Sequence, residues 1–138
     1  MEDSELFGLR WDNYQSNLAA SLYSLYKDME LCDVTISADG KSLRAHKNVL
    51  SVCSPYFKEL FMANPGKDTT IILHGVDYNT LCSILEFIYQ GEVTICQEEY
   101  EQFIRVAETL KLQGPTNNSS SLSSVNWIYN IGFTFIKM

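Results

Sequence analysis

The sequence predicts an α+β domain, because short alternating strands and longer helical segments follow one another in a chain of 138 residues. Residues 33–38 alternate β-branched and polar side chains, and Asp39-Gly40, a dipeptide typical of tight hairpin turns, follows them directly. Residues 41–45 can supply the returning strand, and helical spacing begins near residue 46. We expect the rest of the chain to be organised around this stretch, from Asp33 to Met62.

Two elements precede the hairpin. Residues 6–11 predict a first strand rich in large apolar side chains, and Asp12 or Asn13 can cap the helix that follows. That helix, over residues 14–29, carries more apolar surface than one stripe needs, so we expect this end to pack against another protein. The alternative is that both elements only cover their own sheet. The predicted stripe is Tyr14, Leu18, Leu22, Leu25 and Met29, with Tyr23 and Tyr26 outside it.

The second half of the domain continues with alternating helices and strands. Ser54-Pro55 predicts a helix start, because a serine oxygen caps free amides and proline fits the first helical position. A loop over residues 64–68 and a strand over residues 70–73 come next. The remaining elements are a helix over 78–90 capped by Asp77 and stopped by Gly91, a last strand over 92–95, and one or two helices over 98–112.

The composition changes after Pro115. Residues 116–121 are Thr, Asn and Ser, which have nothing to bury and predict a flexible linker. Residues 127–136 are apolar and strand-prone instead, and they could form an added strand, a binding peptide or a tail that pairs with exposed sheet edges. They could equally be the unselected ending of an alternative transcript. We therefore divide the chain into a domain, 1–115, and a tail, 116–138, that is expected to be poorly ordered.

Composition and charge exclude several classes of function. The 46% of hydrophobic residues suffices for a core, but no run approaches the roughly 20 apolar residues that span a membrane. Residues 1–5 are acidic where a secretory signal is basic, so we expect an intracellular protein without membrane contact. The net charge of −7 and the scattered Lys and Arg residues oppose direct nucleic-acid binding.

Few residues could support catalysis or bind a metal. The two histidines are isolated in sequence, and the chain lacks both a glycine-rich phosphate loop and a metal-ligand cluster. A catalytic pair of Cys53 with His46 would need an accessible thiolate beside a base, and we do not favour it. We expect no enzyme, no cofactor and no metal. Four dispersed cysteines without a Cys-x-x-Cys pair predict buried, reduced thiols: Cys32, Cys53, Cys82 and Cys96.

Three segments, 33–36, 43–47 and 50–57, closely resemble the central motif of BTB/POZ domains, which are protein-interaction modules. Residues 6–18 resemble the N-terminal signature of the Tramtrack group, a BTB subfamily known mainly from arthropods, and the resemblance continues to about Gly114. It implies a small mixed sheet flanked by a cluster of short helices, with an N-terminal strand and a long helix used for dimerisation. It also implies assemblies larger than dimers.

The resemblance further implies which residues meet at the dimer interface. In the family the N-terminal strand pairs with a strand of the partner, here residues 6–11 of one subunit with residues 92–95 of the other. We expect Phe7 and Trp11 to be anchors, since aromatic residues dominate such interfaces. The expected interface residues are Leu6, Phe7, Leu9, Trp11, Tyr14, Leu18, Leu22, Val93 and Ile95.

A charged pocket is a second expectation from the resemblance. In BTB transcription factors an acidic residue at the position of Asp33 and a basic residue at that of Lys47 line a pocket near the dimer centre, and both charges are present here. Burying such a pair costs desolvation, so its presence favours a role in specific pairing or in partner binding more than in stability. The alternative is an ordinary satisfied salt bridge. The resemblance also makes His46 a structural residue.

The function implied is homomeric and heteromeric assembly for a transcription regulator in the nucleus, without a DNA-binding domain in this chain. The expected partners are a second copy, related BTB proteins and co-regulator proteins. The chain would be either a short form that co-assembles with DNA-binding relatives, occupying their dimer partners without contributing DNA contacts, or a stand-alone scaffold. The alternative function is a substrate adaptor for a cullin-type ubiquitin ligase. Met62-Ala63-Asn64 lacks the glutamate of the adaptors' apolar-x-Glu motif, which argues against it.

Overall fold

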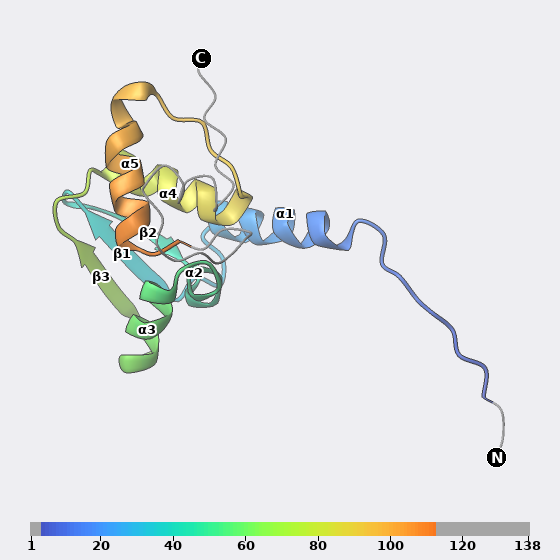
Figure 1. Cartoon of the computed structure of the whole chain (residues 1–138). Coiled ribbons are helices and arrows are strands. Elements are labelled where there is room, and N and C mark those ends of the chain that lie inside the picture. Colours follow the sequence, from blue (N-terminus) through green and yellow to red (C-terminus); the bar gives the residue numbers. More distant parts are fainter. Residues whose placement is uncertain (1–3, 113–138) are drawn as a thin grey trace, which may run out of the picture.

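The computed structural model describes residues 4–112 of the chain (Figure 1). The predictions for the linker and for the apolar segment 127–136 lie outside these residues. The elements follow in the order α1 (Tyr14–Lys27), β1 (Val34–Ala38), β2 (Lys41–Ala45), α2 (Lys47–Cys53), α3 (Pro55–Ala63), β3 (Thr69–Leu73), α4 (Tyr78–Gln90) and α5 (Gln97–Thr109).

The sheet is mixed and has the strand order β2-β1-β3. β1 and β2 form the predicted hairpin, in which Val34 pairs with Ala45 and Ala38 with Lys41. Asp39 and Gly40 both have positive φ, 55° and 77°, which is the geometry that a two-residue turn of type I′ needs. β1 and β2, which both lie between Asp33 and Met62, form the middle and one edge of the sheet. β3 forms the other edge and runs parallel to β1 after the chain has passed through α2 and α3.

The core lies between one face of this sheet and the helices beside it (Figure 1). Along β1, fully buried and half-buried residues alternate, so only one face of the strand points into the core. Phe57 of α3 and Phe103 of α5 are among the largest fully buried side chains. The others include Ile36, Leu50, Leu81, Ile84, Leu85 and Leu110.

Several helix ends follow the predicted chemistry. Ser54 Oγ accepts a hydrogen bond from the Phe57 amide at 3.1 Å, and Pro55 occupies the first helical position of α3. The same hydroxyl donates to the carbonyl oxygen of Leu110 at 2.5 Å, which ties the start of α3 to the end of α5. Gly91, with φ 79°, ends α4 as predicted.

Two predicted caps do not form. Asn13 occupies the cap position of α1 in a left-handed conformation, φ 60°, and its side chain makes no cap hydrogen bond. Instead, Ser16 Oγ donates to the Asn13 carbonyl oxygen at 3.2 Å. Asp77 precedes α4 without a side-chain cap because its carboxylate accepts a hydrogen bond from Gln102 of α5, at 3.4 Å.

The predicted strands over residues 6–11 and 92–95 are absent from the described part of the chain. Both segments are irregular, and the sheet that residues 4–112 form has the three strands β1, β2 and β3 only. The physical reason is that a strand is defined by hydrogen bonds to a neighbouring strand, and one chain offers these segments no such neighbour. Over the described range, 4–112, no helix combines the length and apolar character required to cross a bilayer.

Candidate interaction surface

The N-terminal arm, which we define as residues 4–27, projects away from the rest of the domain, the body (Figure 1). α1 has no buried residue along its whole length. Phe7 is 79% exposed and Trp11 is 66% exposed, although the Trp11 ring contacts Tyr14, with ring centroids 5.0 Å apart. The arm therefore presents a row of large apolar side chains to solvent: Leu6, Phe7, Leu9, Trp11, Tyr14 and Leu18.

The arm meets the body through the C-terminal half of α1, which packs on α4. Leu22, Tyr23 and Tyr26 are half-buried there against the core. Both tyrosines lie outside the stripe predicted from spacing, yet they contact the body together with Leu22, which belongs to the stripe. α1 has two apolar faces. One packs against the body, and the other, with Tyr14 and Leu18, remains exposed.

The other two predicted interface residues lie in the segment between α4 and α5. Val93 and Ile95 are half-buried and pack against the core from this irregular segment. A single chain does not bring them into a strand with residues 6–11. Their assignment to a dimer interface remains a prediction.

A polar cluster at the side of α1 reinforces its contact with α4. The Tyr23 hydroxyl donates to the two carboxylate oxygens of Glu86 at 2.9 and 3.1 Å, and Lys27 Nζ lies 3.6 Å from the same carboxylate. Gln90 Nε2 also donates to Glu86, at 3.0 Å. We call these four residues the Glu86 cluster. The Lys27 side chain is about half exposed, so water and salt weaken this attachment.

His46 lies buried at the junction of β2 and α2. Its backbone N–H donates to the Tyr89 hydroxyl at 3.0 Å, its Nδ1 lies 2.6 Å from the same hydroxyl, and its Nε2 lies 2.8 Å from the Glu30 carbonyl oxygen. Because both ring nitrogens are engaged, the imidazole is a satisfied structural group, as the resemblance implied. Burial raises the pKa of the Tyr89 phenol well above its ordinary value, which keeps its hydrogen in place.

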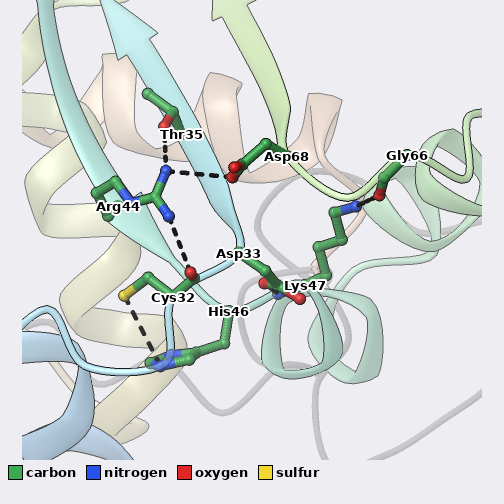
Figure 2. Close-up of polar contacts among 8 residues, drawn as sticks. All are labelled: Cys32, Asp33, Thr35, Arg44, His46, Lys47, Gly66 and Asp68. Atoms are coloured by element: carbon green, nitrogen blue, oxygen red, sulfur yellow. Dashed lines mark hydrogen bonds and ion pairs between the residues drawn. The ribbon is translucent and has the colours of Figure 1, made fainter.

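Asp33 and Lys47 lie side by side, but they are not joined by their charges (Figure 2). The Asp33 carboxylate accepts a hydrogen bond from the backbone N–H of Lys47 at 2.8 Å, at the first residue of α2. The Lys47 ammonium reaches away to the carbonyl oxygen of Gly66, 2.6 Å from Nζ, and lies over the Phe61 ring. The carboxylate thus acts as a cap for α2, where the helix dipole favours a negative charge. The pocket near a dimer centre remains a prediction.

Arg44 is a structural residue that the sequence reasoning missed. Its guanidinium donates to Thr35 Oγ1 and to the Cys32 carbonyl oxygen, both at 2.8 Å, and lies 3.6 Å from Asp68 (Figure 2). It thereby joins the hairpin to the loop that enters β3. The hairpin register could have found the first contact, because it places Arg44 directly opposite Thr35.

The cysteines are less buried than predicted. Cys32, Cys53 and Cys82 are half-buried and Cys96 is exposed, and all four are free thiols. The cysteine beside His46 is Cys32, with Sγ 3.8 Å from Nε2, whereas Cys53 approaches the Ile88 carbonyl oxygen instead. Burial raises the pKa of the Cys32 and Cys53 thiols, so neither resembles an activated nucleophile. Within residues 4–112, no three His, Cys, Asp or Glu side chains gather in a way that could hold a metal ion.

This combination of a small mixed sheet, a helical cluster and an exposed N-terminal arm defines an interaction domain. The model of the BTB/POZ domain matches residues 22–124, and the chain belongs to this family. The BTB domain of zebrafish PATZ1 has a similar structure, with a TM-score of 0.70 and 25% identity, covering 78% of this chain and 88% of that one. The predicted family and fold are confirmed.

Curated relatives include Tramtrack-type BTB transcription regulators of Drosophila melanogaster. Tramtrack, alpha isoform, is 46% identical over 113 residues and bric-a-brac 2 is 45% identical over 112 residues. These matches cover 82% and 81% of this chain but only 14% and 10% of those proteins. Longitudinals lacking protein-like is 42% identical over 122 residues, which is 88% of this chain and 96% of that protein. The family and its relatives point to a non-enzymatic interaction domain.

Proposed function

We propose that this chain assembles with a second copy of itself, and with related BTB proteins, as the interaction domain of a transcription regulator in the nucleus. The observation that carries the proposal is the row of large apolar side chains on an arm with no buried residue in its helix. Exposing such an apolar surface to water is unfavourable in free energy, so a complex in which a partner covers it is stabilised.

The two sides of the interface would complement each other. Residues 4–11 have an extended, unpaired backbone and need a neighbouring strand, and the segment with Val93 and Ile95 offers an unpaired backbone on the body. Pairing between subunits would satisfy both and would bury Phe7 and Trp11 as anchors. An assembled pair would also bring two copies of the Asp33 and Lys47 region toward its centre, where the predicted charged pocket would meet co-regulators.

The net charge of −7 opposes direct contact with DNA, so its regulatory role would pass through its partners. Heteromeric assembly with a DNA-binding BTB protein is the simplest route. The chain then contributes a subunit without contributing a DNA contact.

Light scattering at several concentrations tests the assembly directly. One chain has a mass of 15.7 kDa, and we expect the full chain to scatter light with at least twice that mass. We expect the double variant Phe7→Ser with Trp11→Ser to have a lower mass than the parent. Ile72→Ser is the matched control, because Ile72 is 62% exposed but lies on β3 of the body. An arm variant with the mass of the parent, at equal folded content, would overturn the proposal.

The cullin adaptor predicted as the alternative can be separated from this function in the same preparations. α3 ends at Ala63, with Met62 exposed in its last turn and Asn64 directly after it, in the place where adaptors carry an apolar-x-Glu motif. A pull-down with purified cullin should recover nothing. Saturable cullin binding would favour the adaptor function.

A further inference from the structure

A closed ring of contacts holds the C-terminal end of α1 to the body. Tyr26, in the last turn of α1, stacks on Tyr89 of α4, with ring centroids 4.4 Å apart and planes 15° apart. The Tyr89 hydroxyl is hydrogen-bonded to Nδ1 of His46, and Nε2 of His46 is hydrogen-bonded to the Glu30 carbonyl oxygen. The Glu30 N–H in turn donates to the Leu25 carbonyl oxygen of α1 at 2.9 Å. The ring therefore begins and ends on the same helical turn.

The fixed acceptor role of the Glu30 carbonyl decides which of the other groups in this ring donate and which accept. The Glu30 carbonyl can only accept, so Nε2 of His46 donates to it, and in the tautomer with one ring hydrogen Nδ1 is then an acceptor. The Tyr89 O–H donates to Nδ1, while its oxygen accepts from the His46 backbone N–H. One hydroxyl thus satisfies two groups of a residue that is almost fully buried.

α1 depends on this ring more than an ordinary helix would. It has 14 residues, and an isolated helix of that length is marginal in water. None of its side chains is buried, so its direction is set by the few points at which it is attached. Within residues 4–112, the Glu86 cluster is the other polar attachment, and it lies at the more exposed side of the helix, where water competes for its hydrogen bonds.

We propose that Tyr89 is the positioning residue that fixes the direction in which α1 leaves the body, and that it thereby sets the geometry of the assembling arm. The second half of the proposal rests on the proposed interaction function. Tyr89 makes no contact with the exposed apolar row itself, which begins at the opposite end of α1 and continues into residues 4–11. Its effect on a partner passes entirely through the helix.

Hydrogen exchange and sedimentation equilibrium of the full chain test the two halves separately. In Tyr89→Phe the stack with Tyr26 is retained, but the His46 N–H and Nδ1 lose their partner in a buried site. We expect amides of residues 14–27 to exchange about tenfold faster, and the dissociation constant of assembly to rise about tenfold. The control is Tyr23→Phe, which removes a hydroxyl from the same helix contact but leaves the Glu86 carboxylate to Lys27 and Gln90. There we expect changes below about threefold.

A second variant covers the case in which Tyr89→Phe does not fold. Tyr26→Leu removes the stack from the α1 side and leaves every buried hydrogen bond of Tyr89 and His46 in place. We expect the same loss of protection over residues 14–27, with exchange in β1 and α4 unchanged.

Equal acceleration of α1 and the core in these variants would show a general loss of stability and would overturn the positioning role. Unchanged exchange of α1 would overturn it as well. If the unmodified chain sediments as a single copy at every concentration, the proposed assembly fails. The exchange of α1 would still decide whether Tyr89 positions the helix.

Discussion

The arm and the body use the same kind of side chain in opposite ways. In the body, Phe57 and Phe103 are almost completely buried, and Phe57 stacks on Phe61 with ring centroids 5.8 Å apart. In the arm, Phe7 and Trp11 are largely exposed. Folding of one chain therefore accounts for the aromatic residues of the body and for Tyr23 and Tyr26, which contact it. Exposure of Phe7 and Trp11 would be explained by assembly.

The largest expected effect separates folding from assembly. Phe57→Ala should lower the free energy of unfolding by about 3–5 kcal/mol, because it leaves a cavity in a closely packed core. Phe7→Ala should change it by no more than about 0.5 kcal/mol in dilute solution, where the chain is a single copy. Urea unfolding followed by circular dichroism measures both. A comparable loss in the two variants would show that the arm belongs to the core of a single chain.

A smaller effect distinguishes a helix cap from a charge pair. Asp33→Ala removes the acceptor of the Lys47 N–H and should cost about 1 kcal/mol of unfolding free energy. Lys47→Ala keeps that N–H and should cost less than about 0.5 kcal/mol, since its ammonium bonds an exposed carbonyl.

The double variant of Asp33 and Lys47 should equal the sum of the single variants to within about 0.5 kcal/mol. A coupling well above that value would mean that the two charges act as a pair. The same proteins also test the predicted pocket. Weaker assembly of Asp33→Ala, at a stability matched by another body variant, would support a pocket at the dimer centre.

The smallest effect concerns the exposed attachment between arm and body. Glu86→Gln removes the ion pair with Lys27 but keeps an acceptor for the Tyr23 hydroxyl. We expect it to change the unfolding free energy by less than about 0.5 kcal/mol, and the change should vanish at high salt. Thermal unfolding at two salt concentrations measures it. A cost above that of Asp33→Ala would make the Glu86 cluster the main anchor of α1.

Local chemistry was enough to predict most of the body. The helix over 78–90 and its end at Gly91 were predicted at their observed bounds, and the Asp-Gly turn and Ser54-Pro55 start were predicted with their physical reasons. These features depend on neighbours in sequence. The strands over 6–11 and 92–95 do not form in a single chain, because a strand exists only with its partner and the predicted pairing joins these two segments between subunits.

The contacts of the candidate surface were harder to predict than the fold. Spacing identified an apolar stripe on α1, but which face meets the body depends on where α4 lies, so spacing alone did not show that Tyr23 and Tyr26 contact the body. Likewise, opposite charges at Asp33 and Lys47 suggested an ion pair or pocket, whereas the start of α2 supplies a backbone N–H closer to the carboxylate. Sequence gives the charge of a residue, and only the fold gives its nearest donor.

The raised thiol pKa values have a practical consequence for following the arm. Burial raises the pKa of Cys32 and Cys53, and a hydrogen bond to Glu98 is the main cause that raises that of the exposed Cys96. Since the thiolate is the form that reacts with alkylating dyes, a raised pKa disfavours alkylation of these three sulfur atoms. A reporter cysteine introduced into the solvated arm would lack the burial that hinders access to Cys32 and Cys53, and exposed Cys96 is the native thiol to replace before such labelling.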